Sequence, residues 1–176
     1  MNKKYLIGGP SNSGKSTFVL SLVEYLRSKG RTAEAIELDV WSNSYTAFRG
    51  EVPFATRPKR QGLDWDWKTP LDERIRSFNE NQADIVFGDL PGKLDEAIAY
   101  MCSESAADGA LIISRTIDDL TKWRNFFMMR SVHVAHEFLT FLETPPPPIM
   151  LVGMNRELVP EHEKVQWFGE HLLSDN

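Results

Sequence analysis

Eight residues near the amino terminus constrain the fold of this chain more than any other feature. Residues 9–16, GPSNSGKS, place glycine at the first and sixth positions, with lysine and serine directly after the second glycine. Apolar residues at 5–7 precede the segment, and apolar residues at helical spacing follow it over 14–29. The pattern predicts a buried strand, a tight turn and a helix. Glycines allow successive N–H groups to converge at the helix N-terminus, which favours binding of an anion.

The residue types in this turn suit a nucleoside triphosphate. In the pattern G-x-x-x-x-G-K-[ST], the backbone cradles phosphates, the lysine reaches the β- and γ-phosphates and the hydroxyl binds Mg²⁺. The segment resembles the phosphate-binding loop of the P-loop NTPase superfamily. The resemblance implies the fold of that superfamily and a nucleotide held by Gly9, Ser11, Asn12, Ser13, Gly14, Lys15, Ser16 and Thr17.

Short apolar runs alternate with helical patterns along the rest of the chain. Continuous apolar strands separated by helices indicate a parallel sheet covered on both faces. The sequence therefore predicts one three-layer α/β/α domain over residues 1–176, with a mainly parallel sheet of about five strands. We expect strands at 5–7, 32–39, 84–89, 110–114 and 149–154, and helices at 14–29, 71–79, 92–105, 117–142 and 160–173.

Composition excludes some classes of function. Hydrophobic residues make up 41% of the chain, enough for a core, and the net charge of −5 argues against a general nucleic-acid or anionic-membrane surface. The single cysteine, Cys102, rules out an internal disulfide, and no apolar stretch approaches the roughly 20 residues that span a bilayer. We expect a cytoplasmic protein with no membrane span. The sequence leaves the oligomeric state open, a homodimer included.

Two carboxylates follow predicted strands and are candidates for the site. Asp89 ends the run at 84–89, which resembles a Walker B strand, and Gly92 completes a D-x-x-G turn. That resemblance implies that Asp89 holds Mg²⁺ together with Ser16 and that the Gly92 N–H contacts the γ-phosphate. Asp39 ends the second strand and either orients or deprotonates the acceptor of the phosphoryl group, contacts the Mg²⁺ shell or water, or merely caps a turn.

The segment after the last predicted strand bears on the choice of base. Residues 155–158 read NREL, so Leu158 stands where a guanine-specific N-K-x-D motif has aspartate. The segment is more similar to the N-x-x-x-P turn of the dethiobiotin synthetase group, which implies a contact of Asn155 with the base. We therefore expect ATP, with GTP less favoured. Asn155 could also simply shape a turn.

The turn at 89–92, DLPG, resembles the class that includes signal-recognition GTPases, MinD-type ATPases and dethiobiotin synthetase. The MinD subgroup carries a lysine where this chain has Pro10. Residues 63–73 resemble uridine-kinase-like proteins more loosely. The sequence thus predicts a Mg²⁺-dependent enzyme that passes the γ-phosphoryl group of ATP to a small acceptor, with Lys15, Asp39 and Asp89 as catalytic residues. One alternative is a regulatory NTPase that acts through a protein partner, and another is a nucleotide-binding subunit with little turnover.

Other residues allow both functional and structural interpretations. The long segment at 40–70 carries Trp41, Trp65 and Trp67, either as a substrate or partner region or as anchors packed on the core. Three arginines around the predicted helix at 117–142 could contact phosphate: Arg115, Arg124 and Arg130. Three basic residues of the long segment could bind an anionic substrate: Arg57, Lys59 and Arg60. A metal site at helical spacing, formed by His133, His136 and Glu137, is an alternative to a purely structural role for these side chains.

Overall fold

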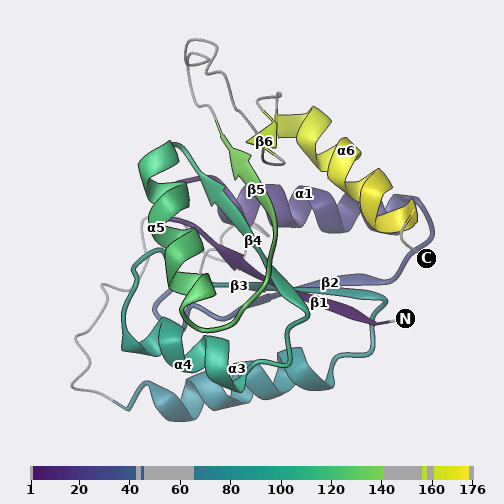
Figure 1. The fold of residues 1–176 in the computed structure, drawn as a ribbon. Helices are drawn as coiled ribbons and strands as arrows, with labels where there is room; N and C mark the ends of the chain where they lie inside the picture. The colour runs from purple at the N-terminus through teal and green to yellow at the C-terminus, as the bar shows by residue number, and fades with distance from the viewer. Residues whose placement is uncertain (1, 43–44, 46–65, 141–155, 158–160, 175–176) are drawn as a thin grey trace.

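The computed structural model describes residues 2–42, 45, 66–140, 156–157 and 161–174 (Figure 1). A six-stranded sheet runs through the molecule in the order β2-β3-β1-β4-β5-β6, and every neighbouring pair is parallel. The predicted parallel sheet is confirmed, with a sixth strand of two residues at its edge. The strands are β1 (Lys3–Gly8), β2 (Ala33–Glu37), β3 (Ile85–Asp89), β4 (Gly109–Ser114), β5 (Val134–Leu139) and β6 (Arg156–Glu157).

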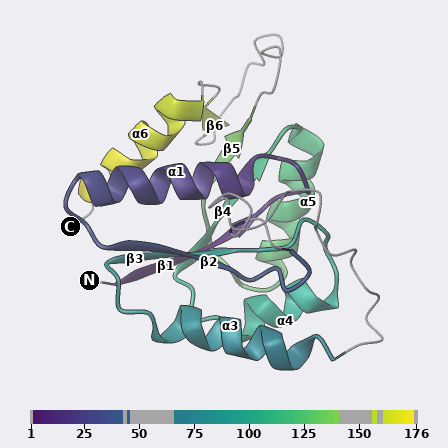
Figure 2. The same ribbon diagram turned by 180° about the vertical axis from the view of Figure 1, so that it is seen from behind.

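Helices cover both faces of the sheet, so the predicted three-layer α/β/α architecture is confirmed (Figures 1 and 2). One apolar core lies between the sheet and α1 and α6, and a second lies between the sheet and α3, α4 and α5. Every residue of β3 and β4 is buried, as expected for strands covered on two faces. The helices are α1 (Lys15–Ser28), α3 (Lys68–Glu80), α4 (Glu96–Glu104), α5 (Ile117–Met128) and α6 (Glu161–Ser174).

Local side-chain contacts set the starts of two helices. Asp95 accepts hydrogen bonds from the N–H groups of Ala97 and Ile98, so α4 begins after Asp95 rather than at residue 92. Helix α3 begins at Lys68, three residues before the expected start at residue 71. Asp66 accepts hydrogen bonds from the N–H and the hydroxyl of Thr69 in the first turn of this helix.

The predicted helix at 117–142 is wrong beyond Met128. Ser131 adopts a left-handed conformation (φ 57°), and the Val132 N–H bonds back to the Phe127 carbonyl, which ends α5. The chain then forms β5, whose Phe138 faces the core beside α1 while Leu139 faces the core beside α5. Side chains of this segment therefore alternate between the two faces of the sheet, as in any strand, and do not follow the helical spacing that the sequence predicts.

The expected strand at 149–154 lies outside the described residues.

Cys102 is buried in α4, and burial raises the pKa of its thiol to about 12. Among the described residues, no helix has the length and apolar character needed to cross a membrane.

Candidate functional site

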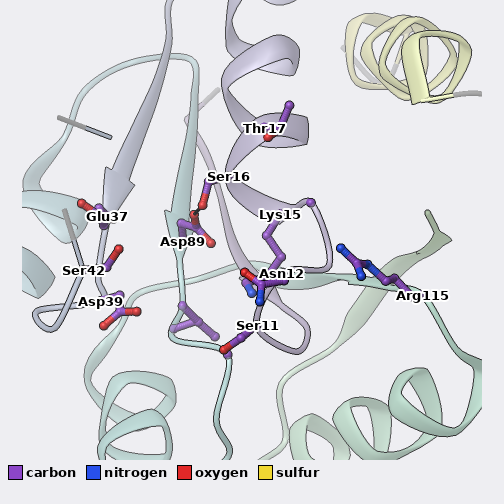
Figure 3. Close-up of a pocket in the computed structure, with 13 residues that line it drawn as sticks. Ser11, Asn12, Lys15, Ser16, Thr17, Glu37, Asp39, Ser42, Asp89 and Arg115 are labelled. Carbon is purple, nitrogen blue, oxygen red and sulfur yellow. Dashed lines mark hydrogen bonds between the residues drawn. The ribbon is translucent and has the colours of Figure 1, made fainter. Parts of the chain in front are cut away.

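A cavity of about 290 Å³ lies at the carboxyl ends of β1, β2, β3 and β4 (Figure 3). The chain leaves β1 toward β2 and β3 on one side and continues with β4 on the other, so the cavity lies where the strand order reverses. Ligands of open α/β sheets bind at this position. The loop between β1 and α1 contributes Ser11, Asn12, Gly14, Lys15, Ser16 and Thr17 to its wall.

The loop is shaped by backbone that only certain residues allow. Gly9 has φ 143°, and a Cβ there would lie 1.9 Å from the Ile113 carbonyl oxygen of β4. Gly14, directly before α1, has φ 87°, and Asn12 has φ 59°. Two positive φ values close together turn successive N–H groups toward one side, which creates a concave site for an anion at the helix N-terminus.

Lys15 provides positive charge inside this loop. Its side chain is 7% exposed, and Nζ donates to the Pro10 carbonyl oxygen at 2.9 Å. Burial lowers the pKa of Lys15, and the nearby carboxylates of Asp89 and Asp39 oppose that shift. An anionic ligand would act in the same direction as those carboxylates and favour the charged ammonium.

Asp89 and Ser16 form the second part of the site. The Ser16 hydroxyl donates to Oδ2 of Asp89 at 2.7 Å. Asp89 is 4% exposed, and burial raises its pKa while Lys15 lowers it. Among the described residues, Oδ1 of Asp89 has no partner that meets hydrogen-bond geometry, but the Tyr45 hydroxyl lies near the carboxylate and also lowers its pKa. A buried carboxylate next to a serine hydroxyl suits a hard cation that prefers oxygen ligands.

The turn after β3 packs directly on the loop. A Cβ added to Gly92 would lie 2.2 Å from the Ser11 nitrogen and 2.4 Å from its hydroxyl oxygen. Only glycine allows this approach, and Gly92 lines the same cavity as Ser11. The packing leaves no room for either segment to move toward the other.

Polar side chains after β2 line the opposite end of the cavity from Arg115, with Lys15 between them (Figure 3). Asp39 is half-buried, and its Oδ1 accepts from the Trp41 N–H at 3.0 Å, so it caps a turn as well as lining the cavity. Arg74 of α3 donates to the carbonyl oxygens of Glu37 and Asp39 at 2.7 and 2.8 Å. These bonds fix the backbone that presents the carboxylates.

Sequence reasoning missed three residues of this region. Glu37 and Ser42 line the cavity beside Asp39. Tyr45 is buried, and its pKa is raised well above the ordinary value by burial and by the negative charges of Asp89 and Glu37. Glu37 and Ser42 could have been inferred from their positions around a strand end. Nothing in the local sequence signals the position of Tyr45.

The structure separates several other sequence candidates from the cavity. Arg124 of α5 forms two bonds with Glu137 of β5, at 2.5 and 2.6 Å, and Arg130 lies over the Phe126 ring. His136 packs on α6, whereas Glu137 meets α5, so the proposed helical metal site does not form. No group of three or more His, Cys, Asp or Glu side chains in the described residues is placed to hold a metal.

Two of the tryptophans that flank the long segment are anchors. Trp41 and Trp67 are each 6% exposed, and their rings lie 6.4 Å apart in the core beside α3 and α4. The packed interpretation is confirmed for these two side chains. Asn155, Trp65, Arg57, Lys59 and Arg60 lie outside the described residues.

Several solved structures share this fold. MinD, the septum site-determining protein of Pyrococcus horikoshii solved with Mg-ADP, matches 79% of this chain and 70% of its own length, with a TM-score of 0.58 and 20% identity. A Borrelia burgdorferi plasmid partition protein matches over both full lengths (TM-score 0.61, 14% identity). A nucleotide-binding protein of Archaeoglobus fulgidus, solved with ADP, matches 97% of this chain and 88% of its own (TM-score 0.61, 16% identity). At these identities the likeness establishes the fold.

The sequence matches no protein-family model and no curated protein.

Proposed function

We propose that this chain binds ATP with Mg²⁺ in the cavity at residues 9–17. The observation that carries the proposal is the bond from Ser16 to the buried Asp89 carboxylate, formed beside Lys15 in one cavity. The loop N–H groups and Lys15 bind phosphate, and the α1 N-terminus adds its positive dipole. The MinD and Archaeoglobus structures were both solved with ADP, which supports the same ligand class.

Ser16 and Asp89 are the residues that would hold Mg²⁺. Mg²⁺ is usually bound by one or two carboxylates together with substrate phosphates and water, and this site offers such a set. The cation supplies neutralisation of charge on the phosphates. The roles of the chain itself are to fix the loop, to hold Lys15 against the phosphates and to keep the Asp89 carboxylate aimed into the cavity.

The reaction proposed is transfer of the γ-phosphoryl group to an acceptor beside Asp39. A new bond forms between the acceptor oxygen and the γ-phosphorus while the bond to the bridging oxygen breaks. The electron pair of the broken bond stays on ADP, and the acceptor proton passes to the Asp39 carboxylate. Asp39 suits this role because it lines the cavity on the side where Glu37 and Ser42 also present oxygen atoms.

The leading acceptor is a small molecule with a hydroxyl group. Support comes from the polar wall of Glu37, Asp39 and Ser42, which could orient such a molecule. The second candidate is water, in a regulatory NTPase that acts through a protein partner. The close packing of Gly92 on Ser11 favours this reading, because it couples the turn after β3 to the phosphate loop. A MinD protein has also been solved in complex with MinC.

The test follows the γ-phosphate. The protein is incubated with Mg²⁺ and γ-labelled ATP, with and without a small-metabolite extract, beside Lys15→Ala as the blank. Label on a new small molecule establishes transfer and identifies the acceptor. Release of inorganic phosphate alone, unaffected by the extract but lost in Lys15→Ala, assigns water as the acceptor. Equal counts from the wild type and the blank would contradict both candidates.

A further inference from the structure

Arg115 is a cation on the cavity wall that the proposed chemistry has not used. It follows β4 directly and lines the cavity together with Asn12 and Lys15. Its side chain is exposed, and among the described residues it has no hydrogen-bond or ion-pair partner. By contrast, Arg27, Arg74 and Arg124 all bind protein oxygen atoms. A guanidinium that lines an anion site without a protein partner is available to a ligand.

The backbone on both sides of Arg115 is fixed to the phosphate loop. Thr140, after β5, donates its hydroxyl proton to the Ser13 carbonyl at 2.7 Å and its N–H to the Ser114 carbonyl at 2.8 Å. The Ser114 hydroxyl accepts from the Thr116 N–H at 3.2 Å, and Thr116 caps α5. Arg115 is therefore held at a constant position relative to the loop, and only its side chain needs to move toward a ligand.

The acidic side chains of the cavity and Arg115 lie on opposite sides of Lys15. Figure 3 shows Glu37, Asp39 and Ser42 on one side of Lys15 and Arg115 on the other. In phosphoryl transfer the attacking and leaving oxygens lie roughly in line through the phosphorus. With the acceptor beside Asp39, the leaving side of the nucleotide faces away from the carboxylates and toward Arg115.

We propose that Arg115 binds the phosphate oxygens of the ADP portion of the nucleotide and stabilises the negative charge that ADP gains as it leaves. The inference rests on the proposed function and adds one residue and one role to it. The guanidinium donates N–H groups to oxygen atoms whose charge rises when the bridging bond breaks. Its contribution is therefore larger in the transition state than in the bound ground state.

The test compares Arg115→Ala and Arg115→Lys with Arg76→Ala, an exposed arginine of α3 outside the cavity. Binding of ATP, ADP and AMP is measured by calorimetry in Mg²⁺, and γ-phosphate turnover gives kcat and KM. We expect Arg115→Ala to weaken ATP and ADP alike by about tenfold. We also expect kcat to fall by at least about tenfold further, with partial recovery in Arg115→Lys and no change in Arg76→Ala.

Two results would overturn the assignment. Binding and turnover of Arg115→Ala equal to those of Arg76→Ala would show that Arg115 does not contact the nucleotide. A loss confined to ATP, with ADP unaffected, would place the guanidinium on the γ-phosphate instead of the leaving group. Failure of the proposed function itself looks different, because the wild type would then bind no ATP or Lys15→Ala would bind it equally well. Thermal melting of each variant confirms that the fold is retained.

Discussion

The centre and the flank of the sheet's carboxyl edge are built in different ways. At the centre, the phosphate loop is enclosed between β4 and the turn after β3, with backbone approaches at Gly9 and Gly92 that leave no room for a Cβ. At the flank, the segment after β2 is held by hydrogen bonds from Arg74 and by the bond from the Trp41 N–H to Asp39. Backbone packing defines the first region, and side chains define the second.

This difference separates what the two regions contribute. A loop defined by backbone packing suits the part of a ligand that does not vary, which in the proposed function is the phosphates, and it tolerates few substitutions. A wall made of side chains can change its chemistry while the fold persists. Substitutions at the centre should therefore affect stability, and substitutions at the flank should affect turnover.

The largest effect on stability is expected at Gly9. Gly9→Ala places a Cβ 1.9 Å from the Ile113 carbonyl at φ 143°, so we expect a loss of at least about 3 kcal/mol in the free energy of unfolding. The matched control is Gly30→Ala, which also has a positive φ (81°) but meets no atom within 4 Å. It should cost only about 1 kcal/mol. Urea denaturation measures both, and equal losses would remove the packing argument at the centre.

The second largest effect on stability is expected at β5, where a buried pair of charged side chains links the strand to α5. Glu137→Gln breaks a largely buried pair with Arg124 and should cost about 2 to 3 kcal/mol, with strong coupling to Arg124→Met in a double-mutant cycle. The exposed pair Arg27–Glu34 is the control, and Glu34→Gln should cost less than about 1 kcal/mol. Absence of coupling would favour one helix over 117–142, in which Arg124 and Glu137 would stand about 20 Å apart.

At the flank, chemistry should change while the fold does not. Asn retains the oxygen that accepts from the Trp41 N–H, so Asp39→Asn should cost less than about 1 kcal/mol. ATP affinity should stay within about threefold of the wild type, because in the proposed reaction Asp39 acts on the acceptor. Transfer of the γ-phosphoryl group should fall by about 100-fold or more, as expected for loss of a general base. Unchanged turnover in single-turnover experiments would exclude Asp39 as that base.

The smallest effect is expected at the opposite edge of the sheet. Asp84 accepts from the N–H and hydroxyl of Thr32, and these bonds lower its pKa. Its contribution to stability is therefore present above its unfolded pKa, near 3.9, and is lost as the pH falls through its lower folded pKa. The difference in Tm between the wild type and Asp84→Asn should be small at pH 7 and shrink below pH 4. A difference in Tm that grew as the pH fell below 4 would contradict the lowered pKa of Asp84.

Much of the fold could be predicted because its central strands leave little choice. Residues 85–88 and 109–113 carry no polar side chain and can only be covered on both faces, and residues 9–16 fix the turn between β1 and α1. The end of α5 could not be predicted in the same way. It depends on Ser131 in a left-handed conformation, which glycine or asparagine would have signalled and serine does not.

The residues of the site also differ in how far local sequence predicts them. Lys15, Ser16, Asp89 and Gly92 come from local patterns at strand ends, and the structure brings them together in one cavity. The position of Tyr45 depends on the path of the chain after β2, which no local pattern determines. Arg115 could be placed near the site but not on its leaving-group side, because that assignment needs the relation of β4 to the carboxylates after β2.

The most direct test of the central claim is calorimetric titration of Mg-ATP into the wild type, Lys15→Ala and Lys29→Ala. Lys15 lies inside the loop, and Lys29 is an exposed lysine beyond the other end of α1. If the cavity binds the triphosphate, the wild type and Lys29→Ala will bind alike, and Lys15→Ala will lose at least about 100-fold in affinity. Equal binding by all three proteins, or no binding by the wild type, would contradict the assignment of the loop as the nucleotide site.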